Sequence, residues 1–258
     1  MPELPDLQVF SRNLTKLFAG KKLESISVKK AAKLKDKPAV LSKALKGARL
    51  KSVYRSGKEL RFQFSNGTLL GLHLMLHGEL KLLDKENEYP HTLVGLHFTG
   101  GKGIAITDWQ KKANIRLDPE DKEGLDALSP DLGYKYLKEI LQTRSPVKTV
   151  LMDQDRIRGI GNAYADEILW KARIAPLSKS NAIPDAAIRK LAKAIPSVLK
   201  KAEKQILKKN PELISGEIRD FLDIHQPKRN LSPTGAKILK ATIGGRKTYY
   251  TDEQELYE

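Results

Sequence analysis

The sequence predicts an α+β protein in three segments. Residues 1–128 are expected to form a β-sandwich with a leading helix, residues 129–224 a helical domain, and residues 225–258 a C-terminal β-hairpin. Two observations predict this division. Short runs of alternating apolar and polar residues, separated by glycine turns, fill most of the first half of the chain. In the second half, apolar residues recur at intervals of three and four, as on one face of a helix.

The composition favours a polyanionic partner. The 258 residues include 47 Lys and Arg against 31 Asp and Glu, which gives a formal net charge of +16 and a pI near 9.7. Ribosomal and membrane-surface proteins share this balance, so the charge alone does not select DNA. There is no apolar run of about eighteen residues that would span a membrane, and the first residues do not have the pattern of a signal peptide. The chain has no cysteine, which excludes disulfides and thiolate metal sites. We expect a cytoplasmic or nucleoid-associated monomer.

The N-terminus predicts a helix that begins within the motif MPELP (residues 1–5) and runs to about Phe18. Two prolines can simply lead into such a helix. Removal of Met1, the usual fate of a methionine before a small residue, would instead leave Pro2 with a free secondary amine. An α-amino group titrates near about pH 7.7–8.0, so an appreciable fraction is neutral and can act as a covalent nucleophile. Glu3 could then transfer protons.

Strand signals dominate residues 23–128. Apolar and polar residues alternate over residues 60–64, and Asn66-Gly67 predicts a hairpin turn after them. Residues 94–98 alternate in the same way before a pair of glycines, whereas residues 36–46 have a pattern compatible with a helix. This part of the chain is therefore predicted to be the sandwich.

The spacing of apolar residues predicts helices in the second half of the chain. Helices are expected over residues 134–141 and 147–151, and a long one over residues 187–209 with Pro196 bending it. The lysines of the long helix are interpreted as a solvated face, of which a few touch phosphate.

The central stretch of residues 151–176 is the most informative. A Gly-Ile-Gly turn at residues 159–161 precedes a helix that opens near Asn162. Glycine turn, asparagine cap and helix N-terminus present N–H groups and a positive dipole end, which suits a phosphate. A plain interhelical turn would give the same short pattern.

Three motifs together resemble the formamidopyrimidine-DNA glycosylase and endonuclease VIII family. They are MPELP at the N-terminus, LMDQDRIRGIGNAYADEILW at residues 151–170 and GGRKTYY at residues 244–250. The resemblance implies a helix–two-turn–helix domain that binds double-stranded DNA containing damaged bases or abasic sites, without a cofactor. It also implies a bifunctional glycosylase and AP lyase of base-excision repair. Pro2 would displace an oxidised base at C1′ as an iminium, and β,δ-elimination would cut the strand.

The resemblance also assigns the candidate site residues. Lys58, in a glycine turn where a lysine is by itself usually solvated, would approach the sugar or its phosphate beside catalytic Pro2 and Glu3. Arg246 would clamp a phosphate next to the lesion. The further DNA contacts are His73, His91 (a weak match), Lys148 and Asn162.

The family's base-plug residues are replaced in this chain. Leu76 stands where a methionine usually fills the space of the flipped base, Gln110 where an arginine reads the opposite base, and Lys112 where a phenylalanine wedges. Trp109 could substitute as the wedge or be buried at a strand end. Because glutamine offers other donors and acceptors than arginine, we expect weak discrimination among opposite bases.

The C-terminal hairpin matches the family's zinc finger but has no cysteine. We therefore expect a zinc-less finger with no bound metal, held by strand pairing and by Ile243, Tyr249 and Tyr250. The replaced plug leaves a second hypothesis open, in which the protein binds damaged or abasic DNA on this fold without excising a base.

Overall fold

The computed structural model describes residues 1–29, 34–84 and 88–258. The chain folds into two compact units. Unit 1 comprises Met1–Asp121 and Ile206–Glu217, and unit 2 comprises Lys122–Gln205 and Ile218–Glu258. The boundaries predicted from the sequence, after residues 128 and 224, differ from those of the two units. The division into three segments therefore remains a prediction. The return of Ile206–Glu217 to unit 1 has no counterpart in them.

Unit 1 begins with α1 (Leu4–Phe18), which confirms the predicted leading helix. Glu3 is its N-cap, and the Asp6 carboxylate accepts the Glu3 N–H at 2.9 Å. The reciprocal bond from the Asp6 N–H to the Glu3 side chain completes a capping box. The helix buries its apolar stripe, Leu7, Phe10, Leu14 and Phe18, in the core of unit 1.

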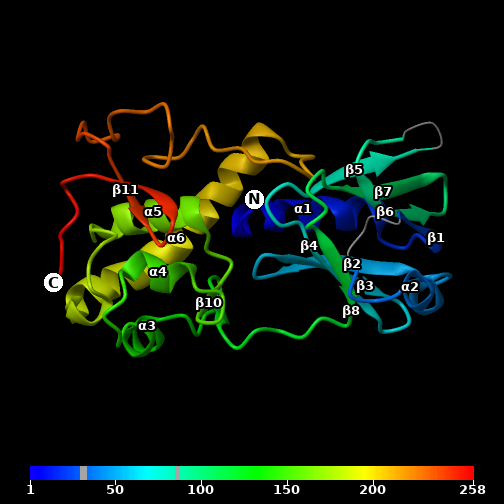
Figure 1. The fold of residues 1–258 in the computed structure, drawn as a ribbon, viewed down its shortest axis with the longest axis horizontal. Coiled ribbons are helices and arrows are strands. Elements are labelled where there is room, and N and C mark those ends of the chain that lie inside the picture. Colours follow the sequence, from blue (N-terminus) through cyan, green and yellow to red (C-terminus); the bar gives the residue numbers. More distant parts are fainter. Residues whose placement is uncertain (30–33, 85–87) are drawn as a thin grey trace. The chain divides into compact units, whose positions relative to one another are not determined.

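Two antiparallel four-stranded sheets form the body of unit 1 (Figure 1). The first has the order β1 (Leu23–Val28), β6 (Thr92–Phe98), β7 (Lys102–Thr107), β5 (Glu79–Leu83). The second has the order β2 (Leu50–Ser56), β3 (Glu59–Phe64), β4 (Leu69–His73), β8 (Asn114–Leu117). Side chains of both sheets, of α1 and of α2 (Pro38–Leu45) join one apolar core, so the predicted sandwich is confirmed.

Unit 2 is mainly helical. Its helices are α3 (Tyr134–Ile140), α4 (Val147–Met152), α5 (Asn162–Ala172), the 3-10 turn η1 (Ser180–Ala182) and α6 (Asp185–Lys209), whose last turn lies in unit 1. A short parallel pair, β9 (Leu125–Asp126) with β10 (Ile157–Arg158), links the start of the unit to the segment between α4 and α5. The predicted helices are confirmed, and α6 contains Pro196.

The predicted C-terminal hairpin is formed by β11 (Leu239–Ile243) and β12 (Arg246–Tyr250). Gly244 and Gly245 have φ of +54° and +71°. Two positive φ values in a two-residue loop define a type I′ turn, which explains why glycines stand there. Tyr249 and Ile238 of the hairpin region pack with Trp170 and Ile224 in a small apolar cluster, so the hairpin is anchored on α5.

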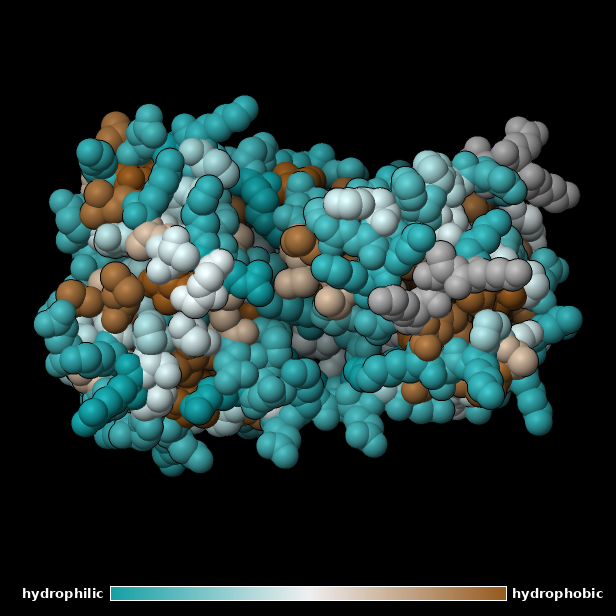
Figure 2. Space-filling view, viewed as in Figure 1, coloured by the Kyte–Doolittle hydropathy of each residue, from teal (hydrophilic) through white to brown (hydrophobic). Residues whose placement is uncertain are grey.

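Among the described residues, no helix is long and apolar enough to cross a membrane. The face drawn in Figure 2 is mostly hydrophilic, with scattered hydrophobic groups. This surface agrees with a composition in which 30% of the residues are charged.

Candidate active site and nucleic-acid interface

The N-terminal residues of unit 1 are held rigidly. Pro2 is buried, and Glu3, 5% exposed, is fixed by the capping box of α1. In the chain that retains Met1, the terminal ammonium forms an ion pair with the Glu217 carboxylate. Removal of Met1 would therefore place the Pro2 amine at the start of a helix whose first carboxylate is already oriented.

Lys58 lies in the two-residue turn between β2 and β3, where Ser56 pairs with Glu59. Arg55 ties this turn to the leading helix. Its Nη1 donates to the Gly57 carbonyl at 3.2 Å, and its Nε donates to Gln8 Oε1 of α1 at 3.1 Å. The turn that carries Lys58 and the helix that follows Pro2 and Glu3 are thus connected through one side chain.

A charge cluster lies behind the same turn. Glu59, 7% exposed, pairs with Arg61 and Arg116, each at 3.3 Å. Arg61 also pairs with Asp121 at 2.9 Å, and Asp121 accepts the Ser56 hydroxyl at 2.8 Å. Because the buried carboxylate is compensated twice, the cluster stabilises the hairpin geometry.

His73 ends β4 with one ring nitrogen engaged. Its Nδ1 accepts the Met75 N–H at 3.1 Å, and Met75 has φ of +56°. This bond fixes the orientation of the His73 ring at the end of β4. His91 is exposed with φ of +61°, and its carbonyl accepts the Asp108 N–H at 3.0 Å.

The base-plug candidates lie on two loops that touch each other. Leu76 is 56% exposed and Trp109 59% exposed. The Trp109 ring contacts the His77 ring, with centroids 4.9 Å apart. The alternative of a buried Trp109 is therefore wrong. Gln110 is half-buried and Lys112 exposed on the same loop.

Asp108 organises that loop. Its carboxylate, 2% exposed, accepts the N–H groups of Gln110, Lys112 and Ala113 at 2.7–2.8 Å. Burial acts to raise the pKa of Asp108. The backbone donors and the nearby His77 outweigh burial, so the pKa lies below its ordinary value.

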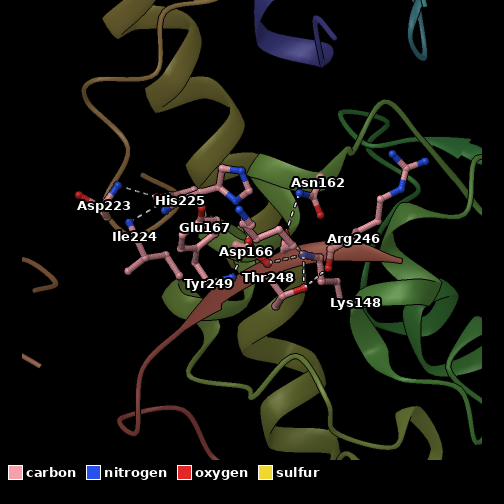
Figure 3. A network of polar contacts seen from close by, with 11 residues as sticks. Lys148, Asn162, Asp166, Glu167, Asp223, Ile224, His225, Arg246, Thr248 and Tyr249 are labelled. Carbon is pink, nitrogen blue, oxygen red and sulfur yellow. Dashed lines mark hydrogen bonds and ion pairs between the residues drawn. The ribbon is translucent and has the colours of Figure 1, made fainter. Parts of the chain in front are cut away.

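In unit 2, Asn162 is the first residue of α5, and Gly161 is the N-cap. The predicted asparagine cap is therefore wrong, because the side chain turns to the hairpin instead. Asn162 Nδ2 donates to the Lys247 carbonyl at 2.9 Å (Figure 3). Its Oδ1 is buried and has no hydrogen-bond partner among the described residues.

Lys148 is not a surface cation. It is 1% exposed, and its Nζ lies 2.8 Å from Asp166 Oδ1 and 2.7 Å from Thr248 Oγ1 (Figure 3). The prediction of a direct DNA contact does not fit this burial, because the ammonium is enclosed between α4, α5 and β12. Lys148 instead holds the hairpin against the helices.

Asp166 is the centre of this buried network. Besides Lys148, its carboxylate accepts the Tyr249 N–H at 3.0 Å and His225 Nδ1 at 2.7 Å. Burial, and then the Asp166 charge, raise the pKa of the Tyr249 phenol. The next residue, Glu167, accepts three backbone N–H groups of residues 223–225 at 2.8–2.9 Å. Burial raises the pKa of Glu167, and those three donors oppose the rise.

Arg246 follows the glycine turn and is exposed. Together with Asp153 of the α4 C-terminus and Gly244 it lines a shallow depression of about 260 Å³. Lys247, the next residue, holds Asn162. The structure thus brings Asn162 and Arg246 together at the turn end of the hairpin, whereas Lys148 supports them from inside.

The buried acids were not predicted as site residues. A signal was available in the motif YADEILW, where two carboxylates stand inside an otherwise apolar helical stretch and must be paired. The link from Arg55 to Gln8 has no comparable signal, because it joins separate elements. Among the described residues, no group of three His, Cys, Asp or Glu is placed to hold a metal ion.

The fold and these two regions define a class of protein. In the sandwich unit, Glu3 is the N-cap of the leading helix, and the turn that carries Lys58 is connected to that helix by Arg55. In the helical unit, the N-terminus of α5 lies beside the hairpin that carries Arg246. Such a protein combines groups for amine and proton-transfer chemistry with groups for binding phosphate.

The comparisons with known proteins agree. Residues 1–115 match the formamidopyrimidine-DNA glycosylase N-terminal domain, and residues 124–210 match the formamidopyrimidine-DNA glycosylase H2TH domain. The formamidopyrimidine-DNA glycosylase of Cytobacillus firmus is 30% identical over 275 residues, which cover 99% of this chain and 100% of that protein. That of Lactobacillus gasseri is 29% identical, with 100% of both chains covered.

Solved structures are similar over the same length. The Lactococcus lactis Fpg in complex with DNA containing an abasic site has a TM-score of 0.88 at 26% identity, covering 98% of this chain and 100% of that one. Its complex with DNA containing an oxidised pyrimidine has a TM-score of 0.87 at 27% identity, covering 97% and 98%. The chain belongs to the formamidopyrimidine-DNA glycosylase family.

Proposed function

We propose that this protein is a bifunctional DNA glycosylase and AP lyase of base-excision repair. Its substrate would be double-stranded DNA with an oxidised base or an abasic site. The observation that carries the proposal is the N-terminus. Buried Pro2 and the N-cap Glu3 directly precede α1, in a chain that matches family members over its whole length.

The chemistry follows from the neutral amine of Pro2 after removal of Met1. Its lone pair attacks C1′, and the N-glycosidic bond breaks with its electrons leaving on the base, which takes up a proton. Opening of the sugar gives an iminium. Glu3 moves protons at the opened sugar. The iminium acidifies C2′, and loss of that proton expels the 3′ phosphate. The conjugated iminium then acidifies C4′, and loss of its proton expels the 5′ phosphate.

Cations and N–H donors would hold the flanking backbone. Lys58 stands on a turn that Arg55 connects to α1, which supports a place beside the sugar or its phosphate. In unit 2, Asn162 and Arg246 are adjacent through Lys247, and exposed Arg246 can grip a phosphate with two parallel N–H bonds. His73 and His91 are proposed as further phosphate contacts. We expect binding to be strongly salt-dependent.

The altered plug bears on specificity. Leu76, Gln110 and Lys112 replace the family's residues, and exposed Trp109 lies beside His77. These side chains support weak discrimination among bases opposite the lesion. Because its substrate would be genomic DNA, we expect the protein to be cytoplasmic and associated with the nucleoid. We also expect it to act as a monomer.

The test is covalent trapping by borohydride on duplex DNA with an abasic site. The Met-free protein should be trapped, because borohydride reduces the iminium to a stable amine. The same protein with a blocked N-terminus, made by retaining Met1 or adding a tag, should lose trapping by at least about a hundredfold, equal to ~2.7 kcal/mol. DNA affinity measured in parallel should be nearly unchanged, since the phosphate contacts lie on other residues.

Two outcomes would contradict this proposal in different ways. Trapping that persists after blocking would move the nucleophile to a lysine, with Lys58 the first candidate. A Met-free protein that binds abasic DNA tightly but is never trapped would instead support the binding-only hypothesis.

A further inference from the structure

A row of lysines runs along one face of α6. Its members in unit 2 are Lys190, Lys193, Lys200, Lys201 and Lys204, and all five are exposed. At 3.6 residues per turn they fall within an arc of about 100°, and the row is about 21 Å long. We call this set the α6 lysine stripe. It contributes five positive charges to one narrow surface.

Most charges of the stripe are not neutralised within the described part of the protein. In the described part of the chain, Lys190, Lys193, Lys200 and Lys204 have no ion-pair partner. Lys201 alone pairs with an acid, Asp223, at 3.4 Å. Like charges three and four positions apart destabilise a helix, so the stripe carries an electrostatic cost that, among the described residues, only the Lys201–Asp223 pair offsets.

Neighbouring cations behave differently. Lys138 pairs with Asp185 at 3.0 Å, and the Arg189 guanidinium lies 3.8 Å from the centre of the Tyr134 ring. The cations around the start of α6 are therefore engaged inside unit 2, and those of the stripe are left for an external anion.

The rest of α6 indicates what kind of anion. The helix buries its apolar side chains, among them Leu191, Ile195 and Leu199. The stripe face itself has Ser197 between its lysines and no large apolar group. A surface of this kind attracts a repeating polyanion through charge, and it offers nothing to insert into lipid.

The stripe is separate from the candidate site of unit 2. Lys201 lines a hollow together with Trp170 and Lys171, at the C-terminal end of α5. Asn162 stands at the opposite end of the same helix, nine residues away, which corresponds to about 14 Å of helix.

We propose that the α6 lysine stripe is a second binding surface for the nucleic-acid backbone. Its length matches about six base pairs of B-form DNA, in which each strand places one phosphate every ~3.4 Å. It takes a stretch of duplex outside the lesion footprint and holds the protein on DNA during search. The inference goes beyond the proposed function and does not require base excision.

The test compares two quadruple variants. The stripe variant changes Lys190, Lys193, Lys200 and Lys204 to Gln, which removes charge and keeps helix propensity. The control changes the exposed lysines Lys16, Lys43, Lys46 and Lys51 of unit 1 to Gln, so the net charge is the same. Affinities are measured between about 50 and 200 mM salt, a range over which binding through phosphate contacts weakens steeply. The probes are a duplex of about one and a half turns with a central abasic site and a duplex about four times longer.

The stripe variant should lose affinity for the long duplex, and its salt slope should fall by up to about 3.6, which is ~0.9 for each lost phosphate contact. Its affinity for the short duplex and its borohydride trapping there should stay within twofold of the unaltered protein. The control should leave the difference between long and short duplexes unchanged.

Three results would overturn the proposal. Equal losses of long-duplex affinity in the stripe variant and the control would show that the effect comes from net charge and not from the position of the lysines. An equal loss on short and long duplexes would place the stripe in the lesion footprint. Loss of binding to phosphatidylserine vesicles, with long-duplex binding unchanged, would make the partner a membrane surface. Absence of trapping in every protein, with stripe-dependent binding intact, would reject the proposed enzyme activity and leave this inference standing.

Discussion

At the scale of single residues, Asp108 controls the shape of the loop that carries Gln110 and Lys112. Because its folded-state pKa is lowered, its charge contributes stability that is present above the unfolded pKa of about 3.9 and lost as pH falls through the folded pKa. We expect Asp108→Asn to reduce the free energy of unfolding by about 1–3 kcal/mol at pH 7. Urea unfolding as a function of pH measures this.

The acid range is the internal control for that variant. The difference between Asp108→Asn and the unaltered protein should shrink below pH about 4, where the native carboxylate protonates as well. A difference that stays constant from pH 7 to pH 3 would show that the charge of Asp108 has no part in the effect.

Trp109 offers an optical probe of the plug region. It is 59% exposed, whereas Trp170, the other tryptophan, is 9% exposed. If Trp109 stacks on a base, its emission should be quenched by abasic duplex, and Trp109→Ala should weaken binding by about 1–3 kcal/mol. Trp109→Phe should retain most of the affinity. Quenching that survives in Trp109→Phe but disappears in Trp170→Phe would exclude Trp109 from the DNA contact.

At the scale of elements, Asp166 connects α4, α5 and the C-terminal hairpin. It is fully buried and accepts from Lys148, His225 and the Tyr249 N–H. Asp166→Asn would leave the Lys148 ammonium buried without its counter-charge, so we expect a loss of about 3–5 kcal/mol in the free energy of unfolding. The same variant should weaken DNA binding, because the hairpin carries Arg246.

The double variant Lys148→Met with Asp166→Leu separates charge from packing. Removing both members of a buried ion pair costs less than removing one, since no isolated charge remains. Thermal and urea unfolding of both proteins should therefore rank the double variant as more stable than Asp166→Asn. The opposite ranking would show that the network acts through shape and hydrogen bonds alone.

Elements were more predictable from the sequence than the contacts between them. Period-two and period-3.6 patterns located β3, β6, α1, α5 and α6, because those periods follow from backbone geometry. The pair Gly244-Gly245 predicted the hairpin, since few residues tolerate its positive φ values. The role of Asn162 was less accessible, because a cap and a first helical residue differ by one position. Only the folded hairpin presents the Lys247 carbonyl that Asn162 binds.

At the scale of the whole molecule, the sequence predicted a sandwich and a helical part, and it placed the motif residues in them. It did not predict that residues 206–217 return to unit 1, where the Leu213 carbonyl accepts from Asn13 and Ser215 from the Leu80 N–H. Those bonds join residues more than a hundred positions apart, and local periodicity carries no information on them. Lys148 shows the same limit. In a basic protein, a lysine is readily interpreted as a phosphate contact. Only the structure shows that Lys148 is buried against Asp166.

The central claim is that the reaction begins at the N-terminal amine. The most direct measurement is the position of the borohydride-reduced adduct, found by protease digestion of the trapped complex and mass spectrometry of the DNA-linked peptide. The adduct should lie on Pro2, in the N-terminal peptide of the Met-free protein. An adduct on Lys58, or on any other lysine, with Pro2 recovered unmodified, would contradict the account.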